Sequence, residues 1–567
     1  MNTICSANPC PIILSSSCVF YEGPNLVCTG IITNETLSSV IQKLSTAICA
    51  ISVGSGILQV TATSPITSSG GKSPNISTSM STNKLIGRAT TGVGIMEEIS
   101  LGTGLSFTGS TLNVYPIPFE YNINGSGIQP ALGGNIASGG YSGIGGGYQN
   151  TASCDNSNIG GGRYNTASCY FATISGGDDN ISSGDCSTIG GGSFNIASNR
   201  SSTVSGGYCN VTNGVGSSIA GGLYNSSASC SSSIGGGYKN TIGCGFANVI
   251  GGGYSNCSSD AASTVGGGYG NNSSGYMSTI AGGKCNIAGA SLSSIGGGVC
   301  NLTIGDCSII GGGFCNFTNN IGSTVGGGSY NCSTGKTSTI GGGEFNNANA
   351  SRTTIGGGNN NTACGLDSSV LGGRFNTASG SSSTVGGGKY NNASASASTI
   401  AGGCCNIANS GCSTIGGGIS NSALNIYASV FGGHNNSASG NYSFVGGGYS
   451  NISSNSSSVV SGGRFNQASG CYSSIGGGGG NLASLRGSTV AGGYYNYATG
   501  LMSGILGGKY NNINGYDYSM IVGSNLTADR ACTTFVNNLS IKNIPTSSVG
   551  LPPGSIWRSG SAVCIVP

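Results

Sequence analysis

The chain is short of charge, histidine, proline and long apolar runs. Of 567 residues, 18 are Lys or Arg and 15 are Asp or Glu, so 6% are charged, where ordinary globular proteins carry about a quarter. The net charge of +3 gives no basic footprint for nucleic acid and no cationic face for an anionic membrane. Twelve Pro exclude collagen. No apolar run is long enough for a membrane-spanning helix, and residues 1–14 lack the basic start of a secretory signal.

Glycine and cysteine are abundant instead. The chain has 110 Gly and is 37% hydrophobic, which favours a folded, repetitive architecture over disorder. Its 24 Cys lack the paired spacing of short secreted disulfide scaffolds, so we expect reduced, structural thiols. Cys285, Cys300 and Cys315 share one repeat position, which leaves interchain disulfides or zinc as a less favoured alternative. The adjacent Cys404 and Cys405 would point apart on a strand.

A 15-residue repeat dominates the sequence. Residues 187–195 read STIGGGSFN and residues 338–346 read STIGGGEFN. Aligned on the final Asn, the repeat recurs 25 times from Asn150 to Asn511, with one 16-residue step. Ile or Val always stands six residues before this Asn, and two Gly stand four and three residues before it. We expect these positions to form structural ladders, beginning with Ile144, Ile159, Ile174 and Ile189, and with Asn150, Asn165, Asn180 and Asn195.

The repeat predicts an all-β, parallel β-solenoid. Its period is too short for helical solenoids, and its Gly, Ser, Thr and Asn disfavour helices. Ser or Thr followed by Ile or Val, bounded by Gly, fits a short strand with alternate side chains outside and inside. Two such strands and two turns fill one coil, and 25 coils spaced about 4.8 Å apart make a rod of roughly 120 Å. The paired Gly fit a turn with positive φ or close backbone approach, and the Asn amides can bond from coil to coil.

The thin interior of such a coil predicts a homo-oligomer. Ordering 15 residues costs about 15 to 30 kcal/mol in backbone entropy, whereas burying one Ile or Val returns about 1.5 to 3 kcal/mol. Burying a second face between chains would offset the difference. Residues 36–50 also predict a short helix, because Leu37, Ile41, Leu44 and Ile48 are spaced by 4, 3 and 4 residues. This helix fits a trimeric coiled coil or a core-packing face equally well.

The repeat resembles the coils of trimeric autotransporter adhesin heads. Residues 521–528, IVGSNLTA, come closest to the short form of that coil, and the other coils differ from it by extra residues between the aliphatic residue and the Asn. The resemblance implies a left-handed β-roll that associates as a homotrimer. Residues 84–115 resemble a module common in bacteriophage tail fibres and other virion appendage proteins, and residues 533–565 are similar to the terminal segment of such proteins, with a hairpin turning at 558–561.

Little in the sequence suggests an active site. The single His, His434, occupies a turn position where neighbouring coils have Ile419 and Tyr449, so we expect an exposed turn residue. Asp forms no column, which disfavours a calcium-binding β-roll. We therefore expect no enzyme activity, no catalytic residue, no cofactor and no metal.

Several coils place a basic residue beside an aromatic one just before the repeated Asn. Aromatic faces can stack on sugars, although bracing between adjacent coils or against a neighbouring chain explains the same residues and is the favoured interpretation. Together with the one Trp, these pairs supply the candidate receptor contacts Arg374, Phe375, Lys389, Tyr390, Arg464, Phe465 and Trp557.

These observations predict a structural virion fibre, such as a phage tail fibre, that serves as a rigid trimeric shaft and host-receptor adhesin. It would be made in the host cytoplasm and assembled into the virion. Its partners would be itself as a homotrimer, other virion or baseplate proteins at the N-terminus, and a host surface receptor, with a glycan as one candidate; nucleic acid and membrane insertion are not expected. The alternatives are a bacterial cell-surface adhesin or self-assembling filament and, less favoured, an ice-binding protein, because twelve of the 25 residues preceding the aliphatic residue are Thr.

Four regions are expected along the chain. Residues 1–60 form an N-terminal attachment or trimerisation module that includes the helix at 36–50. Residues 61–120 form a Ser/Thr-rich linker with a Gly-rich β-hairpin module. Residues 121–516 hold the β-roll repeats, and residues 517–567 form a C-terminal β cap.

Overall fold

The computed structural model describes residues 119–121, 126–540 and 542–567 and, before residue 119, only short strands. It divides into two compact units, residues 1–117 and 118–567. In the first unit the described strands pair antiparallel: β1 (Phe20–Tyr21) with β2 (Glu35–Thr36), β3 (Ile66–Ser68) with β4 (Ile76–Thr78), β5 (Lys84–Gly87) with β6 (Glu97–Ser100), and β7 (Leu105–Thr108) with β8 (Thr111–Val114). The Gly-rich segment 84–115 thus holds the expected short strands. The expected helix at 36–50 lies outside the described residues, except for Thr36 in β2.

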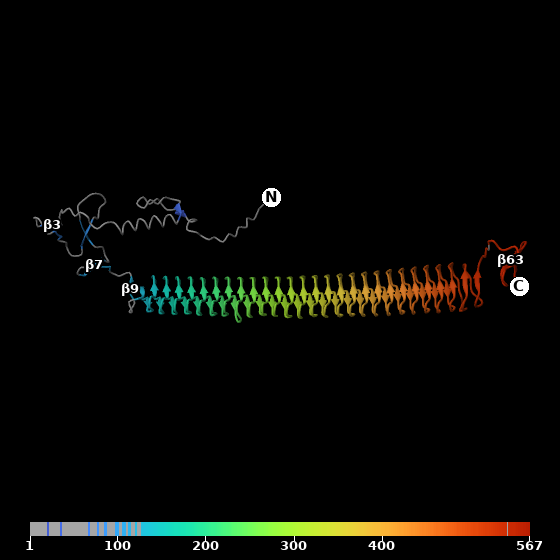
Figure 1. Ribbon diagram of the computed structural model, residues 1–567, viewed down its shortest axis with the longest axis horizontal. Coiled ribbons are helices and arrows are strands. Elements are labelled where there is room, and N and C mark those ends of the chain that lie inside the picture. Colours follow the sequence, from blue (N-terminus) through green and yellow to red (C-terminus); the bar gives the residue numbers. More distant parts are fainter. Residues whose placement is uncertain are drawn as a thin grey trace. The chain divides into compact units, whose positions relative to one another are not determined.

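The second unit contains a parallel β-solenoid, as the repeat predicts (Figure 1). Two sheets run along it. Sheet 1 comprises β10 (Ile128–Pro130), the even-numbered strands from β12 (Gly143–Ile144) to β60 (Gly504–Ile505), β61 (Met520–Val522) and β62 (Thr534–Val536). Sheet 2 has 25 strands, the odd-numbered ones from β11 (Ile136–Ala137) to β59 (Tyr497–Ala498). The solenoid has about 27 turns, so at about 4.8 Å per turn it extends roughly 130 Å.

Each repeat contributes two two-residue strands. From β12 to β60, the sheet 1 strand consists of the repeated Ile or Val and the residue before it. From β13 to β59, the sheet 2 strand consists of the two residues that follow the repeated Asn. Equivalent residues pair from coil to coil, as Ile159 does with Ile174 and Ala152 does with Ala167. The residue two positions before each Asn adds a third line of parallel bridges, such as Tyr148 with Arg163.

Four columns of buried side chains fill the interior. The aliphatic column, from Ile144 to Ile505, is at most 2% exposed. The Asn column is also buried, so the interior is partly polar. The alanine column is the second residue after each Asn, and the serine column is the residue two positions before each aliphatic. Where Ser replaces Ala in the alanine column, its hydroxyl can bond to the serine column across the interior, as Ser273 does with Ser278 at 2.7 Å. Ser227 is the exception, because its buried hydroxyl has no partner.

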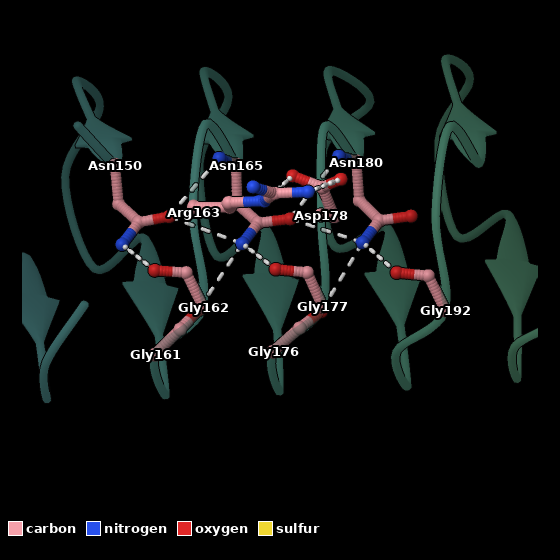
Figure 2. Close-up of polar contacts among 10 residues, drawn as sticks. All are labelled: Asn150, Gly161, Gly162, Arg163, Asn165, Gly176, Gly177, Asp178, Asn180 and Gly192. Carbon is pink, nitrogen blue, oxygen red and sulfur yellow. Dashed lines mark hydrogen bonds and ion pairs between the residues drawn. The ribbon is translucent and has the colours of Figure 1, made fainter. Parts of the chain in front are cut away.

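The Asn column is a continuous hydrogen-bonded ladder (Figure 2). The backbone N–H and Nδ2 of Asn165 both donate to Oδ1 of Asn150, at 3.0 Å each. Nδ2 of Asn165 also donates to the carbonyls of Gly161 (3.1 Å) and Gly177 (2.9 Å). The expected coil-to-coil amide bonding is therefore confirmed, and each amide additionally ties the Gly turns of two coils together. Such bonding offsets the cost of burying a polar side chain.

The second Gly of the repeated pair is required by close packing. Gly162 has φ of 91°, in the region that side chains disfavour, and a Cβ at this position would collide with the carbonyl oxygen of Gly177. The first Gly of the pair differs, because a Cβ on Gly161 would have no atom within 4 Å. Close approach thus explains one Gly of each pair.

The single 16-residue coil absorbs its extra residue in a turn. Residues 243–247 form this turn, in which Gly245 has φ of 90°. Asn248 takes the serine-column position, and its Nδ2 donates to the carbonyl of Cys244 at 2.7 Å. Both sheets continue in register beyond it, with Ile234 paired to Ile250. The interior columns therefore continue through the 16-residue coil without a break.

Added strands and side chains close the ends of the stack. At the start, β9 (Phe119–Tyr121) pairs antiparallel with β10, and Gln129 Oε1 accepts the N–H of Ala137 at 2.5 Å. At the other end, Asn511 Oδ1 accepts the N–H of Leu526 at 3.0 Å, which terminates the Asn column. The hairpin of β63 (Ile556–Ser559) and β64 (Ala562–Ile565) turns at Gly560–Ser561, as expected. Within the described part of the chain, no helix has the length and apolarity needed to traverse a membrane.

Candidate functional site

The most distinctive surface of the solenoid is the bend just before the Asn column. We name the two residues directly before each column Asn, from Tyr148 and Gln149 to Lys509 and Tyr510, the aromatic edge. The residue directly before the Asn has a left-handed backbone, with φ of 57° at Tyr164 and 55° at Phe375. Its N–H donates to the previous coil, as Tyr390 N–H does to the carbonyl of Arg374 at 3.0 Å. The aromatic side chains of this bend therefore lie one coil apart and contact one another.

The longest run of rings was not singled out by the sequence. Successive ring centroids lie 5.5, 5.5, 5.8, 5.0 and 4.8 Å apart along Phe194, Tyr208, Tyr224, Tyr238, Tyr254 and Tyr269. Sequence reasoning sought basic–aromatic pairs within one coil. The signal that identifies this run is an aromatic residue at either edge position in successive coils.

Four of the candidate receptor contacts form one cluster. The rings of Phe375 and Tyr390 stack with centroids 4.9 Å apart and planes 6° apart. The Arg374 guanidinium carbon lies 5.0 Å from the Phe375 ring centroid, and Lys389 Nζ lies 4.9 Å from that of Tyr390. These are cation–π contacts within the basic–aromatic pairs that the sequence singled out.

The other three candidates lie apart from that cluster. The Arg464 guanidinium carbon lies 6.0 Å from the ring centroid of Tyr494. Arg464 thus pairs with this ring and not with that of its sequence neighbour Phe465. The Phe465 ring meets Tyr449 edge to face, with centroids 5.1 Å apart. Trp557 lies on β63, paired with Cys564 of the hairpin. The candidates thus do not form one continuous site.

The ring geometry limits what this edge can bind. A stacked ring such as Tyr390 turns one face to the neighbouring ring and has a cation near it, so its faces are largely occupied. Tyr390 nevertheless remains 48% exposed and Phe465 57% exposed. The stacked pairs therefore offer ring edges, tyrosine hydroxyls and basic groups to a partner, and the stacking itself braces adjacent coils as the favoured interpretation expected.

Ion pairs also connect adjacent coils. Arg163 Nε lies 2.7 Å from Asp178 Oδ1 on the aromatic edge (Figure 2). On the other turn of the coil, Arg352 Nη2 donates to Asp367 Oδ2 at 2.7 Å. This hydrogen bond from the Arg352 guanidinium holds the pKa of the Asp367 carboxyl below its usual value. Because both pairs are exposed to solvent, each contributes little to stability.

The histidine and cysteine positions complete the chemistry of the edge. His434 is exposed, as expected, and forms parallel β-bridges with Ile419 and Tyr449 of the neighbouring coils. The ring centroids of His434 and Tyr449 lie 5.2 Å apart. The expectation that Cys404 and Cys405 point apart is wrong: their Sγ atoms lie 3.0 Å apart. The reason is that Cys405 lies in the left-handed turn, with φ of 60°, and not on a strand.

Cys285, Cys300 and Cys315 do occupy the same position in three successive coils, directly before the column Asn. Burial raises the pKa of the Cys315 thiol, and neighbouring Cys300 adds to the rise. The cysteines of the described residues are free of disulfides. In the same part of the chain, no three His, Cys, Asp or Glu side chains gather closely enough to hold a metal ion.

No protein-family model matches this chain, and no curated protein sequence matches it.

Proposed function

We propose that this protein is a structural, non-enzymatic fibre of a virion, such as a phage tail fibre. The solenoid is its rigid shaft, three chains associate into the working fibre, and the fibre contacts a host surface receptor. The first unit attaches it to other virion or baseplate proteins. The chain is made in the host cytoplasm and becomes part of the virion.

One observation carries this proposal: equivalent residues pair in register over about 27 turns. Each coil contacts only its neighbours in such an array, so length is gained by adding coils without changing the cross-section. Both sheets and the Asn ladder run continuously along the stack, and no coil interrupts them. A straight element of roughly 130 Å suits a spacer that holds a contact site away from a particle.

The receptor contact is assigned to exposed groups of the aromatic edge and to Trp557. Because stacked rings leave few free faces, the cluster of Arg374, Phe375, Lys389 and Tyr390 would bind through its basic groups and the Tyr390 hydroxyl. A glycan that carries acidic groups fits this chemistry better than a neutral sugar that needs an open ring face.

Electron microscopy with immunogold labelling tests the proposal. Antibody raised against the purified chain is applied to virions and to cells of the source organism. Gold on virion appendages, together with rods of roughly 130 Å from the purified protein, supports it. Gold on the cell envelope alone favours the alternative of a cell-surface adhesin, and compact particles without a rod contradict both.

Ice binding is retained as a second candidate because of one observation. The Thr residues before the aliphatic column face outward from sheet 1 and pair in register, as Thr188 does with Thr203. The longest uninterrupted runs span three coils, such as Thr324, Thr339 and Thr354. Thermal hysteresis in micromolar protein, abolished by Thr339→Lys, would favour this function over the fibre.

A further inference from the structure

The charges of the solenoid lie on its turns, and the outer faces of its sheets are uncharged. We name two outward rows: the sheet 1 row is the first residue of each strand from β12 to β60, and the sheet 2 row is the first residue of each strand from β11 to β59. Neither row contains a Lys, Arg, Asp, Glu or His. Two flat, uncharged strips therefore run the length of the stack.

The two strips differ in apolar content. In the sheet 1 row, four residues are aliphatic or aromatic: Val249, Ile309, Phe444 and Val459. In the sheet 2 row, eleven are: Ile136, Ile181, Ile196, Val211, Ile287, Leu302, Phe317, Ile407, Ile452, Leu482 and Tyr497. Some of these fall in successive coils and make continuous patches, as Ile181, Ile196 and Val211 do.

These apolar groups are left partly open to solvent by the single chain. Ile287 is 40% exposed, Ile407 is 39% exposed and Ile452 is 38% exposed. Extended apolar surface of this kind typically marks an interaction site. Because the uncharged strip is as long as the solenoid, its occupant must be straight and uncharged over the same length.

We propose that the outer face of sheet 2 is the surface through which copies of this chain associate side by side. The inference rests on the proposed function only in taking the fibre to be an assembly of identical chains. A second copy has the same spacing between coils, so its sheet 2 row matches this one at every turn. In a closed assembly about an axis along the shaft, residues of the same number meet at the same height.

The available area is sufficient. A strip about 120 Å long and about 10 Å wide, spanning the two residues of each strand and the residue that follows them, offers on the order of 1,200 Å² per copy. A stable protein interface of ordinary size uses about 800 Å² per partner. The charged turns then lie at the rim of the interface, where charges are tolerated, and outside its core.

Lysines placed on the two faces test this assignment. The double variant Ile287→Lys with Ile407→Lys charges sheet 2. The matched control, Val249→Lys with Ile309→Lys, charges sheet 1 at residues that are 39% and 47% exposed. Negative-stain microscopy measures how many shafts run side by side, and sedimentation equilibrium measures the number of chains. Circular dichroism compares the β content of every variant with that of the parent chain.

The inference predicts that the parent and the sheet 1 variant form one thick shaft of the same mass. The sheet 2 variant should give separate thin shafts, either as single chains or splayed apart from a common end, and high salt should partly restore the thick shaft. If either pair of lysines prevents folding, milder variants at Thr positions replace both pairs. Thr362→Lys with Thr377→Lys then charges sheet 2, and Thr354→Lys with Thr384→Lys charges sheet 1.

Two results would overturn the inference. A thick shaft that survives lysines on sheet 2, or that separates only with lysines on sheet 1, refutes the choice of face while leaving the fibre intact. A parent protein that is a single thin chain refutes the association itself, and with it the trimeric part of the proposed function. If the parent protein forms single-chain rods and the antibody still labels virion appendages, the role as a fibre remains supported.

Discussion

Replacing one column Asn by Asp should open the solenoid locally. Asn436 is 1% exposed, and its Nδ2 donates to the carbonyls of Gly432 and Gly448, each at 2.9 Å. Asn436→Asp keeps the shape of the side chain and removes both donors. The Gly448 carbonyl keeps the N–H of His434 at 2.8 Å, so only the Gly432 carbonyl loses its partner. Leaving one carbonyl unsatisfied costs about 1 to 3 kcal/mol, and the cost of burying a carboxylate adds to this loss.

The adjacent Asn435 supplies a matched control. Its side chain is exposed and donates only to Ser450 Oγ, at 3.0 Å. Asn435→Asp makes the same chemical change one residue away, and a surface substitution of this kind should change stability by less than about 0.5 kcal/mol. Any difference between the two variants then reports the buried ladder and not the change of charge as such.

Hydrogen exchange measured by mass spectrometry on the full chain separates the two variants. At about 1.4 kcal/mol per factor of ten, the unsatisfied Gly432 carbonyl alone should speed exchange in the coils adjoining Asn436→Asp by about fivefold or more. Asn435→Asp should change it by less than about threefold. Lowering the pH should reduce the effect of Asn436→Asp, because protonation gives the introduced carboxyl a donor again. If both variants exchange at equal rates at every pH measured, the role assigned to the Asn amides is refuted.

Three further predictions follow from the same coils. Gly162→Ala should destabilise its coil through collision with the next carbonyl, whereas Gly161→Ala, with open space at its Cβ, should be milder; exchange rates in the two variants compare them. Ile340→Ala, at a position 0% exposed, should cost about 2 to 5 kcal/mol in the local opening free energy. Arg352→Met should raise the pKa of Asp367 toward its ordinary value, and titration of the carboxyl signal by NMR measures this rise. In the parent chain the ion pair stabilises the folded state at pH values above the unfolded pKa of about 4. This contribution is lost as the pH falls through the lowered pKa of the folded state.

The repeat predicted the coil well because each interior position recurs with little variation. The alternation of an outward residue and a buried Ile or Val was sufficient to place the strands, and the recurring Asn was sufficient to predict a ladder. The ends of the stack were harder to place. Asn135 belongs to the Asn column, since Asn150 bonds to its Oδ1. Gln129 stands where its coil should have an aliphatic residue, so alignment of the repeat missed this coil.

The turn positions were less predictable than the interior. If Cys404 and Cys405 lay on a strand, their side chains would point to opposite sides. The direction of a side chain depends on the backbone dihedrals, and the positive φ of Cys405 cannot be predicted from composition. The ring contacts of the aromatic edge have the same origin, because they depend on which turn residues of successive coils project together. Sequence patterns thus identified the basic–aromatic pairs of the candidate site, but they neither grouped these pairs nor singled out the run of rings from Phe194 to Tyr269.

The polar columns explain how so many coils keep one register. Apolar contacts between Ile, Val and Ala are not directional, so they fix the register of neighbouring coils less sharply than hydrogen bonds do. The Asn amide is directional: Asn165 Nδ2 reaches Oδ1 of Asn150 and two Gly carbonyls at 2.9 to 3.1 Å. A shift of one residue would leave these groups buried without partners in every coil it reached. The 16-residue coil agrees with this account, since its extra residue lies in a turn, and the Asn256 N–H still donates to Asn240 Oδ1 at 3.0 Å. Length in this fold is therefore limited by how faithfully the ladder is repeated, and its Asn recurs in all 25 repeats.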